Sequence, residues 1–186
     1  MGVDALKRPA VFLDRDGVIN RAIVRDGKPY PPDSADDLQI LDGVADALER
    51  LSEEGYLLIV ITNQPDVARG KQTVDELEAI HQKLHDELPL DEIVACCHDD
   101  ADECDCRKPQ PGALLDAAKR HGLDLKKSYM IGDRWRDVEA GQRAGVTALF
   151  IDYGYRERQP EPPFVRVASL AAAADWIIER NQEGIE

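Results

Sequence analysis

The stretch AVFLDRDG, residues 10–17, decides the fold of this chain. Its first part, AVFLD over residues 10–14, is a short apolar run, which is typical of a strand buried on both faces of a parallel sheet. Similar runs follow: YLLIVITN (56–63), EIVACC (92–97), SYMIGD (128–133) and TALFID (147–152). The sequence therefore predicts a sheet of parallel strands, and its first strand ends in two closely spaced carboxylates.

Helical patterns alternate with these runs, at residues 43–54, 73–88, 111–121, 135–144 and about 169–180. The second pattern opens TVDE, in which Thr73 and Glu76 predict a capping box. Residues 29–37 and 155–163 are rich in Pro and charged residues, which favours surface loops. The alternation predicts an α/β fold: a three-layer α/β/α sandwich around a Rossmann-like parallel sheet with right-handed crossovers.

Length and charge limit the functions to consider. The chain has 186 residues, so we expect a single domain spanning residues 1–186. Its formal net charge of −14 argues against nucleic acid as a partner, because phosphate-backbone binding depends on Lys and Arg. No apolar run approaches the roughly 20 residues of a membrane helix, and no signal-peptide pattern opens the chain. We therefore expect a cytoplasmic protein without a membrane partner.

Polar side chains follow the predicted strands at their carboxyl ends, where ligands bind in open α/β sheets. In chain order these side chains are Asp14, Asp16, Thr62, Asn63, Gln64, Lys108, Asp133 and Asp137. Each alone is ambiguous, because an aspartate after a strand often only forms a turn or caps the next helix. Their occurrence at successive strand ends predicts that a hydroxyl, a lysine and several carboxylates converge on one edge of the sheet.

All four cysteines lie in CCHDDADECDC, residues 96–106. Thiols stay reduced in the cytoplasm, which favours metal binding over disulfides. Cys96 with His98, and Cys104 with Cys106, are spaced i, i+2, and in extended chain such side chains point the same way. Three sulfurs and one imidazole predict a closed, structural zinc site, from which Cys97 faces away. Free structural thiols and redox chemistry are the alternatives, although the cluster lacks a Cys-x-x-Cys motif.

Four ordered motifs identify a resemblance: DRDGVIN (14–20), ITNQ (61–64), RKP (107–109) and IGDRWRD (131–137). They resemble the motifs of the haloacid dehalogenase-like phosphatases, over the part of the chain from Val11 to Asp137. Within that superfamily the chain is similar to the small zinc-containing branch, which includes heptose bisphosphate and histidinol-phosphate phosphatases. The resemblance implies a monomeric, Mg²⁺-dependent phosphatase without a large cap domain, whose zinc-clipped loop is structural.

The resemblance also implies roles for single residues. Asp14 would be the nucleophile that forms an aspartyl phosphate, and Asp16 would be the general acid and base. Thr62 and Lys108 would hold the phosphoryl oxygens. The implied Mg²⁺ ligands are Asp14, Asp133 and the backbone carbonyl of Asp16, with Asp137 behind them.

A small phosphorylated metabolite is the expected substrate, contacted by Asn63, Gln64, Arg69, Arg107 and Arg134. The stretch ARGK (68–71) resembles the heptose enzymes, which favours loss of the C7 phosphate of D-glycero-D-manno-heptose 1,7-bisphosphate. Only five residues separate His98 from Cys104, which resembles the histidinol phosphatases, and Pro65 stands where heptose enzymes often have Ser. Histidinol phosphate or another sugar phosphate therefore stays an alternative.

Two functions of a different class compete with this one. DNA-end-processing phosphatases share the motif set, but the acidic charge disfavours them, and a non-enzymatic zinc scaffold is disfavoured by the intact motif residues. His81 and His85 are spaced i, i+4 in HQKLH, and we expect both on an exposed polar face. The sequence assigns no role to Arg25, Lys28, Trp135, Tyr153 and Tyr155.

Overall fold

The computed structural model describes residues 7–183, so both ends of the expected 1–186 domain lie outside the described part. A six-stranded sheet has the order β5-β4-β1-β6-β7-β8, and all neighbouring strands in it are parallel. These strands are β1 (Ala10–Leu13), β4 (Leu57–Asn63), β5 (Glu92–Cys96), β6 (Tyr129–Gly132), β7 (Thr147–Ile151) and β8 (Val165–Val167). The predicted parallel sheet is confirmed, with one edge strand more than the sequence indicated.

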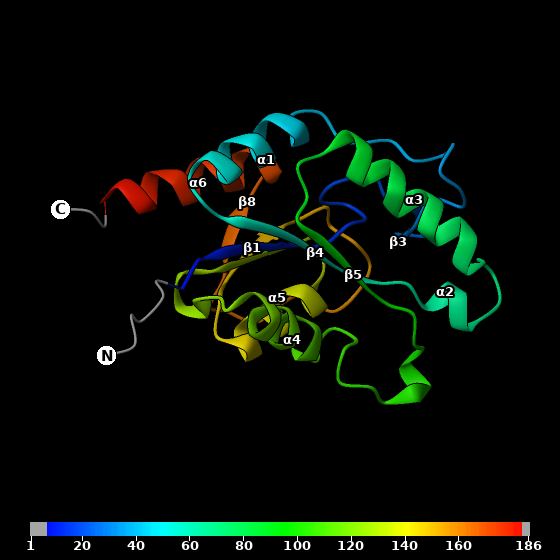
Figure 1. Cartoon of the computed structure of the whole chain (residues 1–186). Helices are drawn as coiled ribbons and strands as arrows, with labels where there is room; N and C mark the ends of the chain where they lie inside the picture. The colour runs from blue at the N-terminus through cyan, green and yellow to red at the C-terminus, as the bar shows by residue number, and fades with distance from the viewer. Residues whose placement is uncertain (1–6, 184–186) are drawn as a thin grey trace.

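Helices cover both faces of the sheet (Figure 1). The principal helices are α1 (Val44–Glu53), α3 (Val74–Glu87), α4 (Gly112–His121), α5 (Trp135–Ala144) and α6 (Leu170–Glu183), with the short α2 at Pro65–Ala68. One core cluster packs α1, α3 and α6 against the sheet, and another packs α4 and α5 against its opposite face. The predicted three-layer α/β/α sandwich is confirmed.

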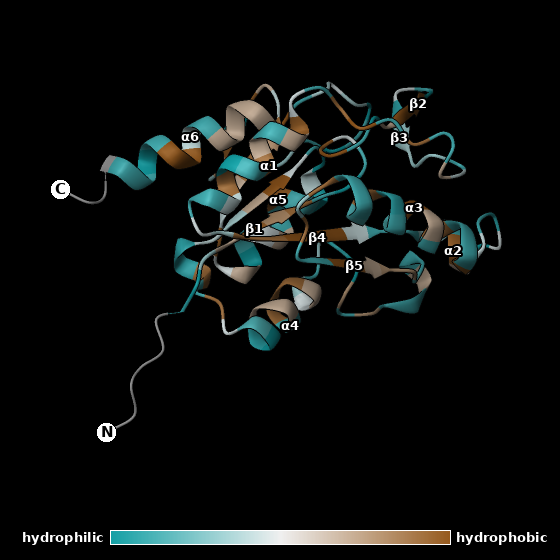
Figure 2. Ribbon diagram, turned by 45° about the horizontal axis from the view of Figure 1, so that its top comes forward, coloured by the Kyte–Doolittle hydropathy of each residue, from teal (hydrophilic) through white to brown (hydrophobic). Residues whose placement is uncertain are grey.

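Strand β1 lies at the centre of this core. Its side chains alternate: Val11 and Leu13 face α1, α3 and α6, whereas Ala10 and Phe12 face α4 and α5. All four are fully buried, which explains the continuous apolar run. Figure 2 shows the hydrophobic colour on the central strands and hydrophilic colour on much of α1 and α3.

A small hairpin differs from the expected loops. Strands β2 (Ile23–Arg25) and β3 (Lys28–Tyr30) pair in antiparallel register, so the segment 29–37 is not entirely a loop. Asp26 and Gly27, which connect them, both have positive φ angles, 52° and 75°. Two such residues favour a tight hairpin turn, so the Asp-Gly pair was the signal that the sequence prediction missed.

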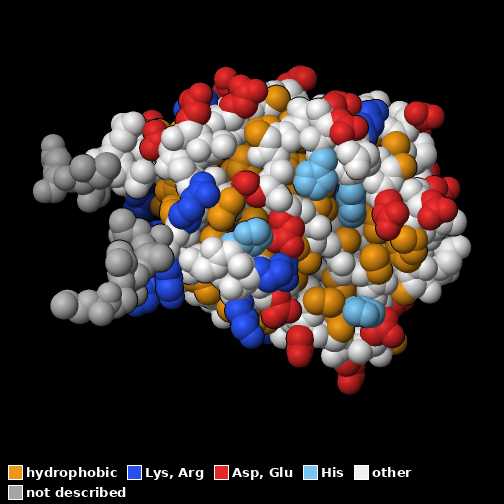
Figure 3. All heavy atoms as spheres, viewed as in Figure 1, with side chains coloured by type: hydrophobic (Ala, Val, Ile, Leu, Met, Phe, Trp, Pro, Cys, Tyr) orange, Lys and Arg blue, Asp and Glu red, His pale blue; other side chains and the backbone are white. Residues whose placement is uncertain are grey.

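No helix within residues 7–183 is long and apolar enough to span a membrane. On the face seen in Figure 3, acidic side chains form separate groups, several of them along the upper and right edges, and Lys, Arg and His side chains lie between them.

Candidate active site

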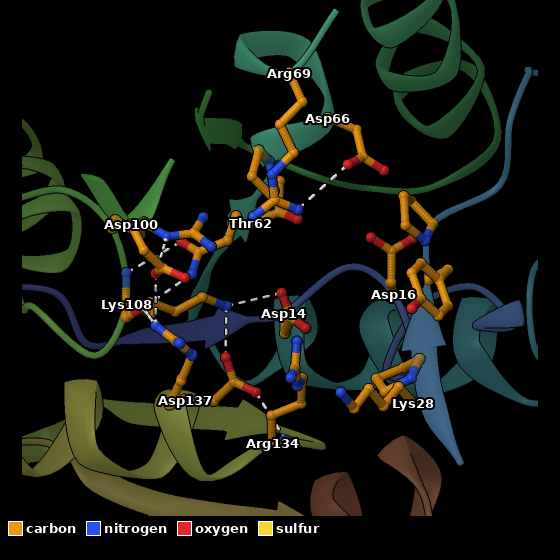
Figure 4. A pocket seen from close by; sticks show the side chains of 17 residues that line it. Asp14, Asp16, Lys28, Thr62, Asp66, Arg69, Asp100, Lys108, Arg134 and Asp137 are labelled. Carbon is orange, nitrogen blue, oxygen red and sulfur yellow. Dashed lines mark hydrogen bonds and ion pairs between the residues drawn. The ribbon is translucent and has the colours of Figure 1, made fainter. Parts of the chain in front are cut away.

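The carboxyl ends of β1, β4 and β6 meet at one pocket of about 350 Å³ (Figure 4). The lining includes six of the eight predicted polar residues: Asp14, Asp16, Thr62, Asn63, Lys108 and Asp137. Figure 4 shows Asp14 in the middle, with Lys108 on one side of it and Asp16 on the other. The structure thus brings together side chains that are separated by more than 100 residues in the sequence.

The Lys108 ammonium group joins the carboxylate that follows β1, Asp14, to a carboxylate in the first turn of α5, Asp137. Its Nζ lies 2.7 Å from Asp14 Oδ1 and 2.6 Å from Asp137 Oδ1, and it donates to the carbonyl of Ile61 at 2.6 Å. Burial alone would lower the pKa of Lys108, but Asp137 and Asp14 outweigh it and raise the pKa. The lysine is therefore charged, and it contacts the predicted nucleophile directly.

Burial also raises the pKa of Asp14 to about 6, against the opposing effect of Lys108. Asp137 and Asp16 add to the rise, because their negative charges lie near. Negative charge in this pocket thus exceeds what one lysine neutralises, and a further cation would stabilise it.

A magnesium ion fits this charge. Asp14, Asp133 and Asp137 each offer an oxygen within 4.8 Å of the others, and all three are buried. Asp133 Oδ2 accepts a hydrogen bond from Tyr155, but its buried Oδ1 has no partner in the described part of the chain. Burial, followed by repulsion from Asp14, raises the pKa of Asp133. Carboxylate oxygens are the donors that Mg²⁺ prefers, so these residues could hold it.

Gly17 leaves the room that Asp133 needs. A Cβ at this position would lie 1.9 Å from Asp133 Oδ2, and the φ of 91° is one that side chains disfavour. The Gly of DRDG therefore allows the loop after β1 to approach the end of β6.

The cysteine segment forms the predicted cluster. Cys96, His98, Cys104 and Cys106 each offer a ligand atom within 4.8 Å of the others, whereas Cys97 is not part of the group. Cys96 Sγ lies 3.6 Å from Cys104 Sγ, 3.0 Å from Cys106 Sγ and 3.6 Å from His98 Nδ1. Tetrahedral zinc with Zn–S bonds of about 2.3 Å places its ligand atoms roughly 3.5–3.8 Å apart. The donor set fits zinc, and the separations of Cys96 from Cys104 and from His98 match this spacing, while the separation of Cys96 from Cys106 is shorter.

Comparisons with known proteins agree with this site. Residues 105–175 match the HAD-hydrolase-like family. The chain is 36% identical over 182 residues to the D-glycero-beta-D-manno-heptose-1,7-bisphosphate 7-phosphatase of Escherichia coli (strain K12), covering 91% of this chain and 88% of that protein. This chain belongs to the haloacid dehalogenase-like phosphatases.

Two further relatives support the assignment. This phosphatase is 33% identical to the D-glycero-D-manno-heptose-1,7-bisphosphate 7-phosphatase of Thermosynechococcus vestitus, covering 92% of this chain and 96% of that protein. Its structure matches that of the D,D-heptose 1,7-bisphosphate phosphatase from B. bronchiseptica complexed with magnesium and phosphate. That match has a TM-score of 0.81 and 31% identity, over 92% of this chain and 99% of the other.

The phosphatase pocket has a rim of arginines. Arg69, Arg107 and Arg134, which the sequence predicted, line it together with Arg136, which the sequence did not single out. Each is paired with an acid. Arg69 Nη2 lies 2.6 Å from Asp99, and Arg107 Nε and Arg136 Nη1 lie 2.8 and 3.2 Å from Asp100, while Arg134 pairs with Glu157. Arg136 lies in the GDRWRD motif, two residues after Arg134, so its position was the available signal.

The amides of the ITNQ motif support other residues of the phosphatase site. Asn63 donates to the Lys108 carbonyl at 3.0 Å and accepts from the Lys108 amide at 3.1 Å, which fixes the RKP segment. Gln64 is 1% exposed and donates to Asp16 Oδ2 and Thr62 Oγ1, both at 2.8 Å. Gln64 does not line the pocket, so the structure gives it a different setting from the predicted substrate contact.

Several other residues had no predicted role. Lys28, Pro29 and Tyr30 of the hairpin line the phosphatase pocket. Tyr155 donates to Asp133 at 2.9 Å, and Tyr153 donates to the Gly17 carbonyl at 3.0 Å.

The prediction that His81 lies on an exposed polar face is wrong. Its side chain is half-buried, with Nε2 3.2 Å from Arg15 Nη1, whereas His85 is exposed as expected. The i, i+4 spacing put both histidines on one side of the helix but did not show that α3 turns the first of them inward.

Proposed function

We propose that this phosphatase removes the C7 phosphate of D-glycero-D-manno-heptose 1,7-bisphosphate, a small sugar phosphate. One observation carries the proposal: a nucleophile-and-lysine centre lies in the same pocket as a rim of four arginines, Arg69, Arg107, Arg134 and Arg136. A bisphosphate has two anionic ends. The centre suits the phosphate that reacts, and the arginine rim suits the one that stays.

The residues around Asp14 support a two-step hydrolysis. In the first step, an Asp14 oxygen attacks phosphorus, the ester P–O bond breaks, and the leaving sugar oxygen takes a proton from Asp16. In the second step, Asp16 takes a proton from water, and the water oxygen attacks phosphorus. The bond from phosphorus to Asp14 breaks, which releases inorganic phosphate and restores both aspartates.

Cations are needed because a phosphate monoester is itself an anion. Lys108 and the Thr62 hydroxyl are placed to contact phosphoryl oxygens, since both line the pocket beside Asp14. Mg²⁺ held by Asp14 and Asp133, with the backbone carbonyl of Asp16, would neutralise charge on the phosphoryl group. Zinc bound by Cys96, His98, Cys104 and Cys106 would have no open coordination position for water. Its role would be to fold the loop that carries Arg107 and Lys108 to the pocket.

We further infer a single domain over residues 1–186 that acts as a monomer on a cytoplasmic metabolite. The comparison substrate is histidinol phosphate, because the five residues between His98 and Cys104 resemble the histidinol phosphatases. Its amine would meet the arginine rim, which disfavours it.

The test is phosphate release with Mg²⁺ from both anomers of the heptose bisphosphate and from histidinol phosphate at matched concentrations. We expect the higher kcat/KM with one heptose anomer. Asp14→Asn should abolish turnover while leaving the fold intact, because Asn keeps the shape but is no nucleophile. A higher kcat/KM for histidinol phosphate would overturn the proposed substrate, and an active Asp14→Asn enzyme would overturn the proposed nucleophile.

A further inference from the structure

Arg15 lies between the two pocket aspartates in the sequence, yet its side chain points into the protein. It is 0% exposed, and it does not line the pocket. A buried guanidinium group is costly unless its donors are paired. Its partners therefore indicate what it does, since substrate cannot reach it.

One edge of the Arg15 guanidinium holds Asp16. Nε lies 3.2 Å from Asp16 Oδ1, and Nη2 lies 3.1 Å from Oδ1 and 3.0 Å from Oδ2. Asn20 adds a hydrogen bond to Oδ1 at 3.0 Å, and Gln64 adds one to Oδ2 at 2.8 Å. The Asp16 side chain keeps 14% of its surface exposed, so it is anchored from behind and open toward the pocket.

The other edge of the guanidinium contacts α3. Arg15 Nη1 lies 3.2 Å from His81 Nε2. Arginine has no acceptor, so Nε2 must accept this bond and the ring carries its proton on Nδ1. Burial, followed by the charge of Arg15, lowers the pKa of His81 to about 4, which agrees with a neutral ring. An arginine held at both edges has little freedom to rotate.

We propose that His81 and Arg15 are positioning residues for proton transfer: His81 fixes the guanidinium, and the guanidinium fixes the Asp16 carboxyl group. This inference rests on the proposed phosphatase mechanism, in which Asp16 protonates the leaving oxygen. It assigns a catalytic purpose to α3, which contributes no residue to the pocket lining.

The choice of leaving group separates a positioning role from a general loss of structure. A general loss of structure should lower kcat/KM equally for alkyl and aryl phosphate esters. When Asp14 attacks phosphorus and the ester P–O bond breaks, a sugar alkoxide needs the proton from Asp16. A para-nitrophenolate ion is stable without it. The value of kcat/KM reports this first step, so a displaced Asp16 should lower it for alkyl esters and spare the aryl ester.

The experiment compares His81→Leu, His81→Gln and Arg15→Lys with the wild type. The substrates are para-nitrophenyl phosphate and whichever alkyl ester, heptose bisphosphate or histidinol phosphate, the wild type hydrolyses faster. We expect His81→Leu to lower kcat/KM about tenfold for the alkyl ester and less than about twofold for the aryl ester, since general acid catalysis supplies about 10²–10⁴-fold. His81→Gln keeps an acceptor near the Nε2 position and should recover most of the loss. His85→Gln, an exposed change on the same helix, should leave both values unchanged.

Each outcome decides the inference. Equal losses for the two esters, or no loss, would overturn it. If His81→Leu fails to fold, Arg15→Lys replaces it in the test. Lysine keeps the positive charge but cannot contact Asp16 and His81 at two edges of one planar group. The same selective loss of kcat/KM for the alkyl ester is expected. A wild type that hydrolyses neither ester would instead overturn the proposed function.

Discussion

At the residue scale, Lys108 is the group whose removal should harm both chemistry and folding. It is 2% exposed and lies between the carboxylates of Asp14 and Asp137. Lys108→Met would leave those buried carboxylates without their cation, and breaking a buried pair in this way costs roughly 3–5 kcal/mol. We expect urea denaturation without Mg²⁺ to show a loss of this size, together with loss of turnover. Lys119→Met on the exposed side of α4 is the control, and an equal effect there would contradict the prediction.

His81 gives a second prediction at this scale, about pH. Its pKa is lowered from 6.5 to about 4 by burial and by Arg15. Below pH 6.5 the unfolded chain binds a proton here that the folded protein does not bind until about pH 4, so stability falls as pH falls through this window. His81→Gln removes the titration. Relative to that variant, the wild type should lose about 1–2 kcal/mol between pH 7 and pH 4.5 in urea denaturation, and a constant difference would exclude the effect.

The sequence predicted that polar residues after successive strands would meet. This prediction holds because the carboxyl ends of parallel strands all lie at one edge of the sheet. Asp14, Thr62, Lys108 and Asp133 are placed this way. Arg15 and His81 were missed for a different reason. Whether a loop arginine points outward or inward depends on its packing, here against His81, which follows Arg15 by 66 residues along the chain.

At the scale of elements, the helix signals were the most reliable. Thr73 accepts from the Glu76 amide at 3.2 Å and Glu76 accepts from the Thr73 amide at 2.7 Å, so the predicted capping box is confirmed. The three-residue strands β2, β3 and β8 were missed, because periodicity cannot be read from three residues.

The loop after β5 carries the prediction that belongs to this scale. Cys96 is buried within the cluster, while Cys97 is outside it. We expect one zinc per chain in the wild type and in Cys97→Ser, and less than one in Cys96→Ser and Cys104→Ser, measured by elemental analysis of the purified protein. Loss of zinc from Cys97→Ser, with retention in Cys96→Ser, would reverse the ligand assignment. Cys96→Ser and Cys97→Ser are a matched pair of variants, because the same chemical change is made at two adjacent cysteines.

At the scale of the whole molecule, distant segments meet around the pocket mouth. Arg69 follows α2, Asp99 and Asp100 lie in the cysteine loop, and Arg136 lies in α5. The ion pairs of Asp100 with Arg107 and Arg136 tie the loop to α5. The sequence predicted arginines at this rim, but it could not assign their partners, since these depend on how the layers bring three segments together.

The same contacts imply that the cysteine loop competes with the substrate. Asp100 neutralises Arg107 and Arg136, the groups suited to a second phosphate, so the substrate must displace a carboxylate to bind there. Asp100→Asn should release both arginines and lower KM for the bisphosphate about two- to tenfold, since exposed pairs contribute about 0.2–1 kcal/mol each. The value of kcat should not change, because the ion pairs of Asp100 within residues 7–183 are with Arg107 and Arg136 and not with Lys108, which contacts Asp14.

A matched variant separates this release from a simple change of net charge. Glu103 lies in the same loop and makes no ion pair with any residue from 7 to 183, so Glu103→Gln removes one charge without freeing an arginine. With para-nitrophenyl phosphate, which has no second phosphate, KM should stay constant in both variants. If Asp100→Asn lowers KM for the mono- and bisphosphate alike, or no more than Glu103→Gln does, the arginine rim does not select for a second phosphate.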